Sequence, residues 1–127
     1  MAKLEHFALF SNDAESLKDF YVAALGLRVV QDNGHATPRG YFLADDAGMA
    51  LEIIDRPPHE LSANTRYICH VAFAVDDLEA ARNMLEAQGR VFEAETLVDT
   101  PGMKTAFFND PEGNRCQIVW RATPLGG

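Results

Sequence analysis

Two histidines and two longer side chains with oxygen donors recur in this sequence at nearly constant spacing. His6 and His70 lie sixty-four residues apart, and Glu52 and Gln117 lie sixty-five residues apart. Two neutral imidazoles, one carboxylate and one amide oxygen are a suitable set of ligands for a divalent transition metal. One negative charge in this set leaves a bound dication partly uncompensated, and that charge can stabilise an oxyanion on a substrate. The four residues are therefore candidate metal ligands, provided that the fold brings them together.

The segments around these residues form an internal repeat. Residues 4–9 match residues 68–73 as short alternating runs with histidine third, and residues 41–54 match residues 106–119. Matched segments in the same order at a nearly constant offset indicate a duplicated unit. Four aligned pairs in the second match are identical: Phe42/Phe107, Asp45/Asp110, Gly48/Gly113 and Ile53/Ile118.

Each half predicts a strand, a helix and three further strands. Apolar residues at three-to-four spacing predict a helix after each first strand. We expect residues 11–13 and 76–77 to cap these helices rather than to bind calcium, and Gly26 and Gly89 to end them. The remaining strands are expected at residues 28–31 and 90–95 and in the two hairpins that turn between Asp and Gly. The fold class is thus α+β, with tandem βαβββ modules at about residues 3–56 and 66–121 and a proline-containing linker at residues 55–60.

Strand alternation predicts which face of each strand carries the candidate ligands. The bulky residues Val71 and Phe73 should pack against the helices, which turns His70 to the other face, and the same parity applies to Glu52 and Gln117. If the two modules pair as one cupped sheet, the four side chains converge on a central cavity. We expect Arg39, Tyr41, Phe42, Phe107 and Arg115 to line that cavity or its mouth, Cys69 and Cys116 to be buried against the helices, and His35 and His59 to be solvated.

Composition excludes several classes of function. The chain has 127 residues with eleven Lys and Arg against nineteen Asp and Glu, which gives a formal net charge of −8. We therefore expect one domain over residues 1–127 and no nucleic-acid partner, which would require a basic surface. Because no apolar run reaches 18 residues and no signal peptide is visible, we expect no membrane partner and a cytoplasmic location, with both cysteines reduced.

On several of these segments the sequence resembles the vicinal oxygen chelate superfamily over about residues 3–121. The segments that carry the resemblance are Leu4-Glu5-His6, Phe20-Tyr21 with Leu25-Gly26-Leu27, Leu51-Glu52-Ile53, residues 70–77 and residues 108–114. The superfamily includes glyoxalase I, epimerases, extradiol dioxygenases, fosfomycin-resistance transferases and the metal-free bleomycin-resistance proteins. The resemblance implies one divalent ion (Ni, Zn, Mn, Co or Fe) held by His6, Glu52, His70 and Gln117.

Gln117 departs from the commonest pattern, in which a glutamate occupies this position. An amide can still offer an oxygen but cannot take a proton, so Glu52 is the candidate catalytic base. The departure also disfavours dioxygenase and fosfomycin-resistance chemistry.

Two function classes remain open. The first is a glyoxalase-like lyase or isomerase that removes a proton beside a carbonyl of a small substrate with two adjacent oxygens and forms a metal-stabilised enediolate. The second is a metal-free protein that binds a small molecule or drug. The resemblance also implies a homodimer, with each site inside one chain or across two, and we expect the loops at residues 32–39 and 97–104 to set specificity.

Overall fold

The chain forms two compact units, residues 1–60 and 61–127, each described by itself. The computed structural model describes residues 4–34, 36–56 and 70–125. Unit 1 contains β1 (His6–Ser11), α1 (Ala14–Leu25), β2 (Arg28–Asp32), β3 (Gly40–Ala44) and β4 (Ala50–Asp55). Unit 2 contains β5 (Val71–Ala74), α3 (Leu78–Ala87), β6 (Val98–Asp99), β7 (Met103–Asn109) and β8 (Arg115–Arg121). The same βαβββ order in both units confirms the predicted α+β repeat.

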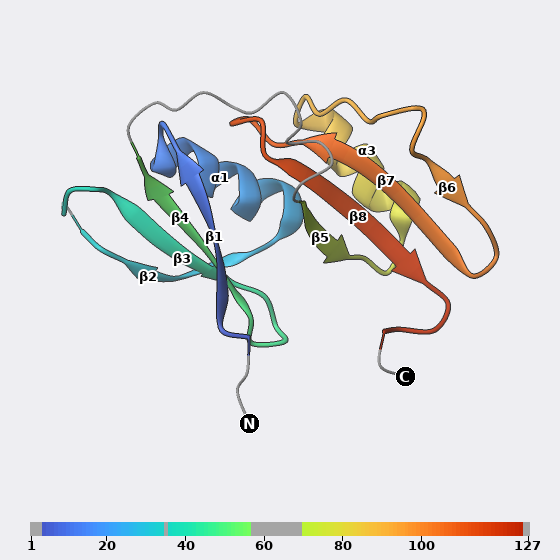
Figure 1. Ribbon diagram of the computed structural model, residues 1–127, viewed down its shortest axis with the longest axis horizontal. Coiled ribbons are helices and arrows are strands. Elements are labelled where there is room, and N and C mark those ends of the chain that lie inside the picture. Colours follow the sequence, from blue (N-terminus) through green and yellow to red (C-terminus); the bar gives the residue numbers. More distant parts are fainter. Residues whose placement is uncertain (1–3, 35, 57–69, 126–127) are drawn as a thin grey trace. The chain divides into compact units, whose positions relative to one another are not determined.

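Each unit builds one mixed four-stranded sheet with a helix on one face (Figure 1). The strand orders are β1-β4-β3-β2 and β5-β8-β7-β6. In both sheets the first strand pairs in parallel with the last, and the other pairs are antiparallel. The last strand of each module is therefore central, between the first strand and a hairpin partner.

Burial follows the alternation that the sequence predicts. On β4, Leu51 and Ile53 are buried while Glu52 between them is half-buried. On β8, Cys116 and Ile118 are buried on either side of Gln117, which is half-buried. We call the sheet face that carries Glu52 or Gln117 the helix-distal face. The helix-facing cores contain Leu9, Leu17, Phe20, Tyr21, Ala24, Tyr41, Leu43, Leu51 and Ile53 in unit 1, and Leu85, Ala106, Phe108, Cys116 and Ile118 in unit 2.

The predicted helix caps are confirmed in both units. The side chain of Asp13 accepts a hydrogen bond from the backbone N–H of Ser16, and that of Asp77 accepts one from Ala80. These bonds satisfy amides that a helix leaves unpaired in its first turn. Gly26 and Gly89 follow the helices at φ of +70° and +85°, as a left-handed helix end requires. No helix within the described ranges is long and apolar enough to cross a membrane.

The two identical Asp/Gly pairs of the repeat form the two hairpin turns. Asp45 Oδ1 accepts from the backbone N–H of Ala47 and Met49, and Asp110 Oδ1 accepts from Glu112 and Asn114. The glycines of the turns, at positions 48 and 113, have φ of +94° and +84°. A carboxylate that bonds two amides and a residue with positive φ together fix the turn, which explains why both identities recur.

The connecting segments of unit 2 differ from the sequence-based expectation in two places. The strand expected at residues 90–95 is wrong, because this segment makes only an isolated bridge between Phe92 and Phe108. The second strand of unit 2 is instead the two-residue β6, so the region expected as a loop at 97–104 contains β6 and the start of β7. Most of the expected linker, together with His35, His59 and Cys69, lies outside the described residues.

The connection between β2 and β3 is held by a hydrogen-bonded cluster around Asp32. Arg39 Nη1 donates to Asp32 Oδ1 and also to Asn33 Oδ1 at 2.9 Å. The backbone N–H of Gly34 donates to Asp32 Oδ1 at 2.8 Å. The Arg39 bond and then the Gly34 amide lower the pKa of Asp32 from its ordinary 3.8 to about 2.

This lowered pKa predicts an acid-sensitive contribution to the stability of unit 1. A carboxyl whose pKa is depressed in the folded state stabilises the fold above its unfolded pKa, and this contribution disappears as the pH falls through the folded pKa. We expect Asp32→Asn to be less stable than wild type above pH 4, with the difference shrinking between about pH 4 and pH 2. Urea unfolding across that range measures it, and a difference that is independent of pH would contradict the assignment.

Candidate metal centre

Unit 1 brings two of the four predicted ligands together on its helix-distal face. In the parallel pairing of β1 with β4, Ala8 is the partner of Glu52, and His6 lies two residues before Ala8 on the same face. His6 Nε2 and Glu52 Oε1 are 3.9 Å apart, too far for a hydrogen bond. The Glu52 side chain is 23% exposed and accepts no hydrogen bond from any described residue. The Glu52 carboxylate, which lies beside an imidazole, can therefore accept from or coordinate a ligand without giving up a bond to a described residue.

The other nitrogen of His6 is held by its sequence neighbour. Nδ1 of His6 lies 2.7 Å from Oε1 of Glu5. Because a carboxylate can only accept, Nδ1 carries the proton of this bond. In the neutral imidazole the lone pair therefore resides on Nε2, the nitrogen nearest Glu52. A carboxylate behind a histidine in this way fixes the tautomer that binds metals.

The His6–Glu52 pair is close enough for both side chains to reach one divalent ion after a small adjustment. Nitrogen and oxygen ligands bind zinc-like ions at about 2.0–2.2 Å, so a shared ion would draw the two atoms somewhat closer than their present 3.9 Å. The donor set also suits the ion, because imidazole and carboxylate are ligands that Zn, Fe, Ni and Co share.

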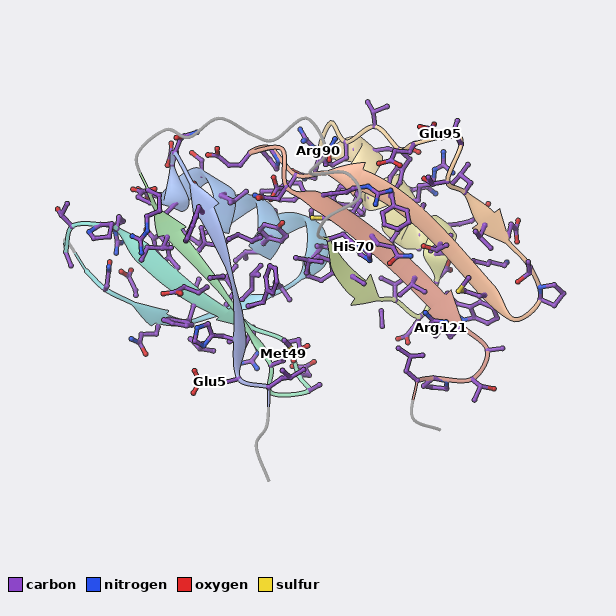
Figure 2. The ribbon with its side chains drawn as sticks, viewed as in Figure 1. Glu5, Met49, His70, Arg90, Glu95 and Arg121 are labelled. Carbon is purple, nitrogen blue, oxygen red and sulfur yellow. The ribbon has the colours of Figure 1, made fainter. Side chains whose placement is uncertain are left out.

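Unit 2 repeats the arrangement around His70. Ala72 is the partner of Gln117 in the parallel pairing of β5 with β8, and His70 lies two residues before Ala72. The His70 ring packs edge-on with Phe107 at a centroid distance of 5.2 Å, and His6 packs with Phe42 in the same way at 5.3 Å. Figure 2 labels His70 at the start of β5. The duplicated register therefore places a histidine, a phenylalanine and a Glu or Gln on the same face of each sheet.

Gln117 is oriented by a hydroxyl from the neighbouring strand. Its Nε2 donates a short hydrogen bond to Oγ1 of Thr105, a buried residue of β7. This bond uses the nitrogen end of the amide. The carbonyl oxygen Oε1 accepts no hydrogen bond from any described residue and remains available to a ligand.

The structure thus pairs His6 with Glu52 in unit 1 and places His70 and Gln117 at corresponding positions of unit 2. In the described parts of the chain, no group of three or more His, Cys, Asp or Glu side chains could hold a metal ion. Each unit supplies one imidazole and one oxygen donor of the predicted four-ligand set. The binding of one ion by both pairs stays a prediction.

Among the residues expected near the cavity, Tyr41 was misplaced. It is buried on the helix-facing side of β3, where Arg39 and Lys18 lie over its ring at 4.4 and 5.0 Å from the centroid. Phe42 and Phe107 do lie on the helix-distal faces, because they are the direct partners of Glu52 and Gln117.

Sequence reasoning missed three supporting side chains: Glu5, Glu93 and Thr105. Thr105 shares its parity with Phe107, so strand alternation could have found it. Glu5 is adjacent in sequence to the candidate ligand His6, and strand alternation alone would turn it to the opposite face. Glu93 lies in the segment that was expected to be a strand, and it forms an ion pair with Arg115 at 3.0 Å.

Comparison with known proteins identifies the family. Residues 3–118 match the model of the Glyoxalase/Bleomycin resistance protein/Dioxygenase superfamily. The chain belongs to this superfamily. This result confirms the vicinal oxygen chelate resemblance, and the match spans both βαβββ units.

Several known proteins are similar to this chain at modest identity. YwkD of Bacillus subtilis (strain 168) is 28% identical over 120 residues, which cover 88% of this chain and 91% of YwkD. The crystal structure of SMU.1112c is 31% identical with a TM-score of 0.76, covering 94% of this chain and 98% of that one. TnmS3, an antibiotic-binding protein from Streptomyces sp. CB03234, is 23% identical with a TM-score of 0.76 over 96% of this chain and 98% of TnmS3.

Proposed function

We propose that this chain is a metal-dependent lyase or isomerase that moves a proton on a small substrate with two adjacent oxygen atoms. The observation that carries the proposal is the His6–Glu52 pair. Its two facing atoms are separated by 3.9 Å, its imidazole is fixed by Glu5, and its carboxylate has no donor among the described residues. The equivalent register of His70 and Gln117 supports a second pair of ligands.

In this proposal His6, Glu52, His70 and Gln117 hold one divalent ion. When bound, the ion supplies positive charge that offsets the charge developing on the substrate oxygens. Glu52 takes the proton from the carbon beside the carbonyl and returns it to the same carbon or to its neighbour. Because Gln117 cannot take a proton, one base carries both transfers. Phe42 and Phe107 supply apolar surface beside the donors, which limits water and strengthens the electrostatic interactions.

The proposal predicts how purified protein holds metal. Protein prepared without chelator is expected to contain near-stoichiometric Ni, Zn, Mn, Co or Fe. Both His6→Ala and His70→Ala should weaken binding by on the order of 100-fold or more, because each removes a ligand rather than an outer partner of one. His59→Ala, a histidine outside the repeated pairs, is the matched control. Elemental analysis and metal titration measure the effect, and saturating metal should raise the free energy of unfolding of the wild type by about 2.7 kcal/mol at a hundredfold excess over Kd.

A metal-free binding protein is the second candidate. The observation that favours it is an aromatic ring on each helix-distal face, Phe42 and Phe107, which gives a flat ligand apolar surface to contact. TnmS3, whose fold this chain shares, is described as antibiotic-binding. Washed protein that contains no metal, and that neither binds nor is stabilised by added metal, would favour this candidate over the enzyme.

Assembly and location are proposals as well. We propose a cytoplasmic homodimer whose partner is a small-molecule substrate, with no nucleic-acid or membrane partner. Light scattering of the purified protein tests the dimer.

A further inference from the structure

A largely buried ion pair on the helix-distal face of unit 2 has no counterpart at the equivalent position of the repeat in unit 1. Arg115 Nε and Nη2 donate to the two carboxylate oxygens of Glu93 at 3.1 and 3.0 Å. The two side chains are only 9% and 16% exposed. The position equivalent to Arg115 in the repeat is Ala50, so unit 1 has no cation there. A two-point bond of this kind fixes the guanidinium in one orientation.

The fixed guanidinium lies against the aromatic ring that contacts His70. The Arg115 guanidinium carbon is 3.8 Å from the centroid of Phe107, well within the range of a cation–π interaction. Phe107 in turn packs edge-on against the His70 ring at 5.2 Å. The backbone N–H of Glu93 also donates to the carbonyl oxygen of Phe107 at 2.9 Å, which ties the segment holding Glu93 to β7. Contacts therefore run without a gap from Glu93 through Arg115 and Phe107 to His70.

The two units thus support their histidines differently. His6 has a carboxylate at Nδ1 in addition to its contact with Phe42. For His70 the supporting contact is Phe107, and Arg115 restrains that ring. Glu93 also neutralises Arg115, which would otherwise place an uncompensated positive charge beside residues that are proposed to bind a cation.

We propose that Arg115 is a positioning residue for His70, acting through Phe107, and that Glu93 holds Arg115 in place and cancels its charge. The predicted effect of these residues on metal affinity rests on the proposed function. The series of contacts from Glu93 to His70 is present without any metal.

Two measurements test the proposal: the NMR resonances of His70 in metal-free protein, and the affinity of the protein for Zn²⁺. In Arg115→Met the Phe107 ring loses its restraint, so the imidazole proton resonances of His70 should shift in the NMR spectrum of metal-free protein. Affinity for Zn²⁺ should fall about 10- to 100-fold, the usual cost of losing an outer partner of a metal ligand. Glu93→Gln keeps the arginine but removes the carboxylate that orients it and offsets its charge, and should lower the affinity in the same way. Arg115→Lys keeps a cation over the ring and should recover part of the loss.

Arg39→Met is the matched control. Arg39 also pairs with an acid and stacks on an aromatic ring, but Tyr41 is on the helix-facing side. This variant should leave the His70 resonances and the Zn²⁺ affinity unchanged. Unshifted His70 resonances in both Arg115→Met and Glu93→Gln, with both proteins folded, would overturn the proposal. If the wild type binds no metal, the proposed function fails, and the resonances alone decide the positioning role.

Discussion

Replacing Glu52 with Gln is expected to lower turnover by about 10²- to 10⁴-fold, the usual contribution of a general base. The substitution keeps an oxygen donor and nearly the same shape, so metal should still bind, as the proposal already assigns an amide oxygen to Gln117. The lost chemistry is the acceptance of a proton. A hemithioacetal or an acyl thioester is the substrate to use, and incorporation of deuterium from D₂O at the carbon beside the carbonyl reports the proton transfer.

Gln117→Glu is the matched control for this experiment. It places a second carboxylate at the equivalent position of unit 2 and should retain metal while changing the pH profile of turnover. Equal loss of turnover in Glu52→Gln and Gln117→Glu would contradict the assignment of Glu52 as the base. Retention of full activity in Glu52→Gln would do the same.

Two adjacent phenylalanines on β7 are expected to respond in opposite ways to truncation. Phe108 is fully buried on the helix-facing side, so Phe108→Ala should cost about 3–5 kcal/mol of unfolding free energy. Phe107 is half-buried on the other face and contacts His70. Phe107→Ala should cost less stability but should weaken metal binding. Urea unfolding and metal titration of both variants test the division of roles between the two faces, which would be wrong if Phe107→Ala were the more destabilising.

The repeat made the fold predictable because its identities fall at points where structure requires particular residues. Gly48 and Gly113 supply the positive φ of the hairpin turns, and Ile53 and Ile118 are fully buried in the helix-facing cores. These requirements are local or depend only on strand parity. The pattern of residue types in the sequence is therefore sufficient to predict these features.

The features that the sequence did not predict depend on partners that are distant along the chain. Residues 90–95 have the composition of a strand, but a strand also needs a neighbour over its length, and only Phe92 forms a bridge. Tyr41 and Phe42 are adjacent on β3, so they lie on opposite faces, and only Phe42 reaches the face of Glu52. The Arg115–Glu93 pair joins side chains of two segments, and no periodicity in either segment indicates that they meet.

X-ray absorption of the metal-loaded protein tests most directly whether the duplicated pairs share one ion. The account predicts one ion per site with two imidazoles among nitrogen and oxygen neighbours at about 2.0–2.2 Å. One imidazole should disappear from the spectrum in His6→Ala and one in His70→Ala. A spectrum whose imidazole contribution is unchanged in either variant would contradict the account.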